Sequence, residues 1–154
     1  LAQTLPAPGL VDVALDLATL VADKALDFEL SIGSAPVRAH EWALRELTRN
    51  LMHNAIKHAP AGTSLSVRLE VAADEATLTV SDSGSGISEE LRQRLFQPFS
   101  AGADGVGGSG LGLAICHEIV RSLGGHIALD NRTLHDQVVG VDATVRLPLA
   151  DNRG

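Results

Sequence analysis

Glycine is concentrated directly before an apolar helical pattern in the segment 104–124. Five glycines stand at positions 105, 107, 108, 110 and 112, and the apolar residues after them recur at helical spacing. Backbone without Cβ atoms can approach a ligand closely, and the N–H groups at a helix N-terminus favour a bound anion. Phosphate suits this arrangement best, so the segment predicts a nucleotide site.

Two common glycine motifs do not account for this segment. Gly105, Gly107 and Gly110 have the spacing of the dinucleotide fingerprint, but that motif follows a strand, and residues 97–104 have the composition of a loop. The chain contains no Gly-Lys-Ser or Gly-Lys-Thr, so the sequence excludes a P-loop. A flexible linker would explain the glycines but not the regular helix that follows them.

A second feature is a stripe of polar side chains in the long helical pattern of residues 39–59. Asn50 and Asn54 are four positions apart, and Lys57 and His58 continue the row, so in a helix they share one face. Asparagine is a weak helix former, and a functional contact could explain why two lie inside one helix. A solvated polar face is the alternative explanation.

A third feature is an aspartate in a glycine-containing turn at the end of a predicted strand. Asp82, Gly84 and Gly86 directly follow a predicted hairpin whose second strand ends at Ser81. A tight turn of this kind directs the carboxylate into a cleft, where it can accept a hydrogen bond from an amine. An ordinary acidic turn would have the same sequence.

The elements that would position these features alternate between helices and hairpins. The helical pattern covers residues 11–28, 39–59, 89–95 and 110–123. The strand pattern covers residues 27–32, 64–71, 76–81, 126–130 and 141–149. Residues 1–10 read as a linker, and a loop containing His135 joins the last two strands. Phe96 and Phe99 are expected to anchor the glycine-rich loop on the core. This order predicts an α+β two-layer sandwich.

The composition is that of a single globular domain. The 154 residues are 45% apolar and 20% charged, with a mean hydropathy of +0.14. A net charge of −7, without a cluster of Lys and Arg, argues against nucleic acid as a main partner. No signal peptide or apolar run of about 18 residues occurs, so this stretch is not expected to cross a membrane.

The cysteine and histidines do not predict a catalytic or metal site. Cys116 is the single cysteine, which is typical of a reducing compartment, and its apolar neighbours favour core packing over a nucleophile. The six histidines have no partners at metal-ligand spacing, so no zinc site is predicted.

Together, the motifs resemble the N, G1, F and G2 boxes of sensor histidine kinases. They stand in the family order, and they occupy residues 50–54, 82–86, 96–99 and 108–113. The resemblance covers roughly residues 11–149. It implies the Bergerat ATP-binding fold, in which a mixed sheet is covered on one face by about three helices. ATP would lie between those helices and a lid formed by residues 97–109.

The resemblance also implies roles for individual residues, with ATP and Mg²⁺ as cofactors. Asn54 would bind Mg²⁺ and, together with Lys57 near the phosphates, would be catalytic. Asp82 would accept a hydrogen bond from the adenine amine, in a base pocket shaped by Gly84 and Gly86. The other expected nucleotide contacts are Asn50, His58, Ile87, Phe99, Gly108, Ser109, Gly110, Leu111, Gly112 and Leu113.

The implied reaction moves the γ-phosphoryl of ATP to a histidine on a separate dimerisation domain, and then to a response regulator. Residues 1–10 would be the linker from that phosphoacceptor domain, residues 11–149 the catalytic domain and residues 150–154 a tail. The acceptor histidine is expected upstream of Leu1. We expect a cytoplasmic domain of an inner-membrane sensor protein, connected to the membrane only through upstream segments.

Two departures from the family pattern leave alternatives open. Related kinases often have an aromatic residue where this chain has His58, and no Lys or Arg lies between Phe96 and Gly112. A nucleotide-sensing module without phosphotransfer is therefore one alternative. A slow ATPase of the gyrase or mismatch-repair type is another, but those enzymes place a glutamate base where this chain has Asn50.

Overall fold

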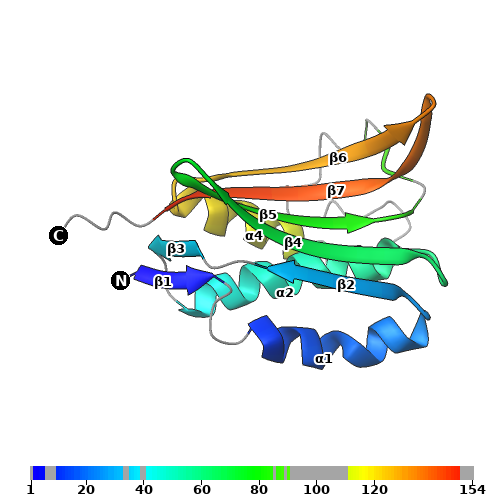
Figure 1. Cartoon of the computed structure of the whole chain (residues 1–154), viewed down its shortest axis with the longest axis horizontal. Helices are drawn as coiled ribbons and strands as arrows, with labels where there is room; N and C mark the ends of the chain where they lie inside the picture. The colour runs from blue at the N-terminus through cyan, green and yellow to red at the C-terminus, as the bar shows by residue number, and fades with distance from the viewer. Residues whose placement is uncertain are drawn as a thin grey trace.

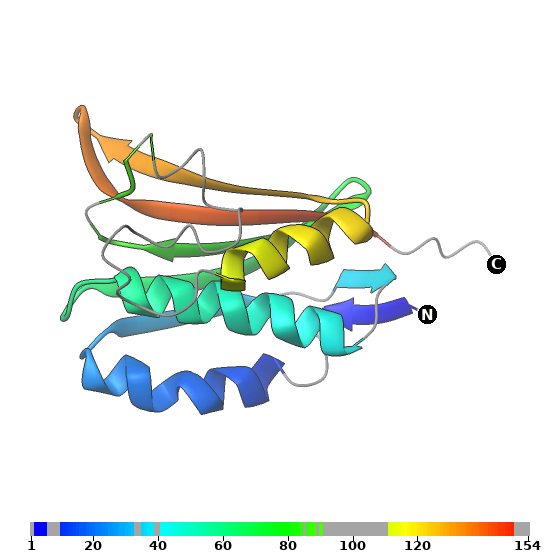
Figure 2. The same cartoon turned by 180° about the vertical axis from the view of Figure 1, so that it is seen from behind.

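The described residues of the chain fold into a mixed five-stranded sheet with three helices on one face (Figures 1 and 2). This computed structural model describes residues 2–5, 10–32, 35–38, 41–84, 86–88, 90 and 111–149. The two-layer α+β architecture predicted from the sequence is therefore confirmed. Of the short helix expected over residues 89–95 only residue 90 is described, and the loop of residues 97–109 lies outside the described residues.

The sheet has the strand order β2-β4-β5-β7-β6. Its strands are β2 (Asp27–Ile32), β4 (Ser64–Ala72), β5 (Glu75–Asp82), β6 (His126–Leu134) and β7 (Gln137–Pro148). β2 pairs parallel with β4, and the other neighbours pair antiparallel. Along β5 every second residue is buried, which is the period of a strand with one face on a core. Asp82 continues this buried row after Leu78 and Val80.

The helical layer consists of α1 (Leu10–Asp23), α2 (Glu41–His58) and α4 (Leu111–Ser122). α2 packs against both other helices and against β5. Its buried face meets the sheet and α4 through Leu44, Leu47, Leu51, Met52, Ala55 and Ile56. Pro60 lies just beyond its end, where proline cannot continue a helix. The polar stripe predicted from the sequence thus runs along the central helix of the layer.

A second, two-stranded sheet was not predicted. Ala2–Leu5 forms β1 and pairs antiparallel with β3 (Ala35–Arg38), although residues 1–10 read as a linker from sequence. Val37 is buried and bridges to Leu149 at the end of β7. Four-residue strands show too few alternations to stand out, and here they gain stability from pairing with distant residues.

The β6–β7 hairpin is longer than predicted. The sequence suggested strands over 126–130 and 141–149 joined by a loop, but the ladder continues to a two-residue turn at His135 and Asp136. Both turn residues have positive φ, 53° and 64°. Two-residue hairpin turns favour positive φ at both positions, and Asn-Gly is the usual sequence there. The His-Asp sequence of this turn therefore did not indicate a tight hairpin. In the described parts of the chain, no helix is both long and apolar enough to span a bilayer.

Candidate nucleotide-binding site

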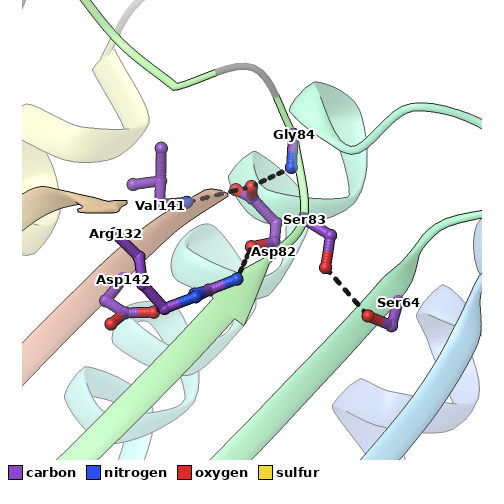
Figure 3. Close-up of polar contacts among 7 residues, drawn as sticks. All are labelled: Ser64, Asp82, Ser83, Gly84, Arg132, Val141 and Asp142. Carbon is purple, nitrogen blue, oxygen red and sulfur yellow. Dashed lines mark hydrogen bonds and ion pairs between the residues drawn. The ribbon is translucent and has the colours of Figure 1, made fainter. Parts of the chain in front are cut away.

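The turn after β5 holds the Asp82 side chain in one orientation (Figure 3). Asp82 is buried, with 6% of its surface exposed. Its Oδ1 atom accepts hydrogen bonds from the backbone N–H of Gly84, at 2.8 Å, and of Val141 in β7, at 3.2 Å. Two backbone donors fix one oxygen of the carboxylate, and no hydrogen bond within the described residues engages the other, Oδ2.

Two glycines allow the turn to pack closely on its surroundings. A Cβ on Gly84 would lie 3.2 Å from both Asp82 Oδ1 and the carbonyl oxygen of His58, at the end of α2. Gly86 has a φ of +92°, a conformation that side chains rarely adopt. A Cβ there would lie 2.7 Å from Asn131 Oδ1, closer than atoms can approach. The two glycines of the Asp-x-Gly-x-Gly spacing therefore lie at close contacts, Gly84 with α2 and Gly86 with β6.

The base of the turn is held by Arg132, which sequence reasoning missed. Its guanidinium donates to the carbonyl oxygen of Asp82 at 2.8 Å and pairs with the Asp142 carboxylate (Figure 3). Gly140 makes room for this contact, because a Cβ there would collide with Asp82 O. These residues are about 50 positions or more from Asp82 in sequence, and no local pattern announces them.

The α2 stripe lies at the edge of the buried helix face. Asn50, Asn54 and Lys57 are partly buried, and His58 is exposed. The Asn50 amide donates to the carbonyl oxygen of Glu46 at 2.8 Å, one turn earlier in the same helix. This bond directs the Asn50 side chain along the helix. No corresponding side-chain bond of Asn54 occurs among the described residues.

The His58 imidazole sits in a mixed electrostatic environment at the end of α2. Desolvation lowers the pKa of His58, although part of the residue is exposed, and the charges of Lys57 and Lys24 lower it further. The Asp82 carboxylate acts in the opposite direction. The net effect keeps the imidazole neutral at pH 7. The influence of Asp82 agrees with the contact of Gly84 with the His58 carbonyl, and both place the Asp82 turn close to His58.

The start of α4 lies beside the middle of α2 (Figure 2). Cys116 is buried in α4, and its Sγ lies 3.8 Å from the Leu47 carbonyl oxygen of α2. Burial raises the pKa of the Cys116 thiol to about 12, which agrees with core packing and not with a nucleophile.

The structure brings together part of the predicted site. Asp82, Gly84, Lys57 and His58 meet where β5 ends beside α2, and Asn50 and Asn54 precede them on the same helix. Ile87 and Leu113 are partly buried and pack against the core. Leu111 and Gly112 lie in the first turn of α4. Outside the described residues lie Phe99, Gly108, Ser109 and Gly110.

Comparisons with known proteins identify the family. The family model described as "Histidine kinase-, DNA gyrase B-, and HSP90-like ATPase" matches residues 39–151. The chain therefore belongs to this ATPase family, for which ATP is the nucleotide.

The relatives place the chain within the family. It is 43% identical over 104 residues to the sensor histidine kinase AruS of Pseudomonas aeruginosa, a match that covers 62% of this chain and 10% of AruS. The solved mycobacterial sensor histidine kinase MprB superposes with a TM-score of 0.81 at 26% identity, covering 97% of both chains. The histidine kinase ThkA, solved in complex with the response regulator protein TrrA, has a TM-score of 0.77 at 23% identity, covering 100% of this chain and 43% of ThkA.

The chain spans between 10% and 26% of the length of the first curated relatives that it matches. It is the ATPase domain of a sensor histidine kinase, and the family predicted from the four boxes is confirmed.

Proposed function

We propose that this domain binds Mg·ATP between α2 and the turn after β5 and transfers the γ-phosphoryl to a histidine on a separate domain. The observation that carries the proposal is the buried Asp82 carboxylate, held by two backbone N–H groups directly beside the end of α2. A fixed acceptor in a buried turn can select a base by its exocyclic amine.

Asp82 Oδ2 is the atom that accepts the hydrogen bond from the adenine amine. Gly84 and Gly86 let the base approach the backbone, and Ile87 supplies apolar surface beside it. His58 is neutral at pH 7 and packs at the rim of the base pocket. Because Asp82 holds the base, the phosphates of the nucleotide extend along α2 toward Lys57 and the start of α4.

Asn54 supplies the amide oxygen that binds Mg²⁺. Magnesium in kinases keeps several waters and takes one or two protein oxygens besides the phosphates. Asn54 fits this mode, because it is partly buried on the same face of α2 as Lys57 and its amide oxygen is a hard ligand of the kind that Mg²⁺ accepts. When bound, Mg²⁺ neutralises charge that develops on the phosphates. Lys57 adds a cation from the next turn of α2.

The first turn of α4 and the glycines before it receive the phosphates. Gly108, Ser109, Gly110 and Gly112 offer backbone N–H groups, and the N-terminus of a helix favours negative charge. Leu113 packs against the core and anchors this turn. By the family resemblance, Leu111 and Phe99 belong to the same nucleotide site. Phosphoryl transfer depends mainly on positioning and charge neutralisation, which this set supplies.

The phosphoryl acceptor and the next partner lie on other domains. We infer a dimerisation domain that carries the acceptor histidine, joined through residues 1–10 to a catalytic domain over residues 11–149, and a receiver domain of a response regulator. The structure of ThkA with TrrA supports a partnership of this kind. The sensor kinases among the relatives support a cytoplasmic position next to a membrane sensor.

Two variants and one assay test the proposal. The full-length protein is incubated with γ-labelled ATP and Mg²⁺, and acid-labile, base-stable phosphohistidine is measured. We expect labelling in the wild type and a loss of about 100-fold or more in N54A, whose helix-favouring alanine keeps the fold. H53A is the comparison, because His53 is an exposed neighbour of Asn54 on the same helix.

Three results would contradict the proposal in different ways. Nucleotide binding without phosphohistidine would favour a sensing module. Release of phosphate without phosphohistidine would favour a hydrolase. Equal labelling in N54A and the wild type would exclude Asn54 as the magnesium ligand.

A further inference from the structure

Lys24 is hydrogen-bonded to three carbonyl groups at the end of α2. Its ammonium donates to Ile56 O at 2.8 Å, Lys57 O at 2.7 Å and Ala59 O at 2.9 Å. Lys24 itself follows the last residue of α1 and is 32 to 35 positions away from these acceptors. In sequence it reads as an ordinary surface lysine.

Backbone contacts hold Lys24 in place for this role. Ala25 has a φ of 53°, which ends α1 and turns the chain toward β2. The N–H of Gly62 donates to Lys24 O at 2.8 Å, and the N–H of Asp27 donates to Thr63 O at 2.9 Å. The loops after α1 and α2 are therefore joined at the lysine itself and three residues after it. Figure 2 shows the C-terminal ends of these two helices at the same end of the molecule.

The lysine supplies the hydrogen-bond donors and the positive charge that the C-terminal end of a helix lacks. The last four carbonyl groups of a helix have no partner within it, and the helix dipole concentrates negative charge there. An ammonium has three donors and a positive charge, so Lys24 meets both needs at once. The last turn of α2 is thereby fixed by a side chain from the loop after α1.

That turn is the part of α2 that the nucleotide site depends on. The carbonyl of His58 lies between two of the carbonyls that Lys24 binds, those of Lys57 and Ala59. Gly84 packs against this His58 carbonyl, and its N–H in turn binds Asp82 Oδ1. A contiguous path thus connects the ammonium to the carboxylate through one turn of backbone.

We propose that Lys24 is a positioning residue for the nucleotide site, which holds the last turn of α2 where Lys57 and His58 face the Asp82 turn. The inference rests on the proposed binding of ATP at this site. The loop after α1 thus influences nucleotide affinity, although none of the four sequence motifs lies in that loop.

The test compares K24M, K24R and a matched control in the domain. K24M keeps the length of the side chain but removes the charge and donors, and K24R keeps both. R49M is the control, because Arg49 also ties α1 to α2, through Asp16 at 3.0 Å, but away from the last turn. Calorimetry gives the affinity for Mg·ATP at a temperature where circular dichroism shows each variant to be folded.

We expect K24M to bind Mg·ATP about tenfold more weakly, which corresponds to about 1.4 kcal/mol. K24R should recover most of this loss, and R49M should stay within about twofold of the wild type. NMR titration provides a second readout, because the charge of Lys24 lowers the pKa of His58. That pKa should rise in K24M and not in R49M.

The outcomes separate this inference from the function on which it rests. A wild type that does not bind ATP would overturn the proposed function itself. A wild type that binds ATP while folded K24M binds it equally well would overturn the role of Lys24, even if K24M melts at a lower temperature. Should K24M not fold, K24Q takes its place, since glutamine has no charge and its two N–H donors cannot serve all three carbonyl groups. Wild-type affinity in folded K24Q would contradict the proposal equally.

Discussion

The side-chain amide of Asn131 and the backbone of Ile87 form two hydrogen bonds, each 2.8 Å long. Asn131 Oδ1 accepts from the N–H of Ile87, and Asn131 Nδ2 donates to its carbonyl oxygen. The pair lies beside Gly86, which could not carry a Cβ against Asn131. β6 therefore holds the downstream end of the Asp82 turn through Asn131, while Arg132 holds its base.

The first prediction is that N131A weakens ATP binding by about 5- to 150-fold, because two hydrogen bonds that fix the turn are lost at a net ~0.5–1.5 kcal/mol each. Calorimetry with Mg·ATP measures the change. T133A is the control, since Thr133 is an exposed neighbour on the same strand. Equal losses in both variants would indicate a general weakening of β6 and not a role for the Asn131 pair.

The second prediction concerns the choice of base. D82N keeps an oxygen for the two backbone N–H groups but replaces the other acceptor with an NH₂ donor. Adenine presents an amine at this edge and guanine a carbonyl oxygen. Affinity for ATP should fall about 5- to 150-fold while the ratio of GTP to ATP affinity rises.

Competition binding with both nucleotides measures that ratio, and S83A, which removes only the exposed hydrogen bond between Ser83 and Ser64, serves as the control. An unchanged ratio in folded D82N would show that Asp82 does not read the base.

The third prediction is a pH dependence that involves His58. Because its pKa is lowered in the folded protein, the unfolded chain binds a proton more readily below the ordinary His value of about 6.5. Stability should therefore fall as the pH falls below about 6.5, and not above it.

Urea unfolding at several pH values shows whether H58Q loses part of this slope, because glutamine does not titrate. A His58 pKa at or above the ordinary value, measured by NMR in the wild type, would contradict the prediction that His58 causes this loss of stability.

The fourth prediction is that Cys116 is unreactive in the folded domain. Its thiol is buried, and a pKa of about 12 leaves almost no thiolate at pH 8. A chromogenic disulfide reagent should react slowly with native protein and at least 100-fold faster in urea, because only unfolding exposes the sulfur. Rapid reaction of the native protein, with circular dichroism unchanged, would mean that α4 opens locally.

The sequence predicts those parts of the fold whose pattern is local. α2 was expected over residues 39–59 and spans Glu41–His58, because its apolar spacing and Pro60 are both visible in one segment. The β4–β5 hairpin was found for the same reason, with its turn at Ala73 and Asp74. The β1–β3 pair was not found, because each strand is short and its partner is about 30 residues away.

In the candidate site, too, the residues of a local motif could be predicted and the distant residues that support them could not. Asp82, Gly84 and Gly86 were found because they are close in sequence and belong to a known motif. Their supports could not be found, because Arg132, Asn131 and Lys24 act on backbone atoms of distant segments. A hydrogen bond to a backbone carbonyl imposes no requirement on the residue type of its partner, so it leaves no paired signature in one sequence.

The strand order sets the sequence of events by which the domain folds. Hairpins β4–β5 and β6–β7 join neighbouring segments, but β5 must find β7 across the intervening chain, and the Asp82–Val141 contact spans 59 positions. Distant pairing is slow because loop closure comes before its contacts form. The Asp82 turn is then completed only after the β4–β5 hairpin has paired with the β6–β7 hairpin. ATP should consequently slow unfolding while leaving the refolding rate unchanged, as stopped-flow kinetics with and without nucleotide can measure. A nucleotide that accelerated refolding would instead mean that the two hairpins join before the rate-limiting step.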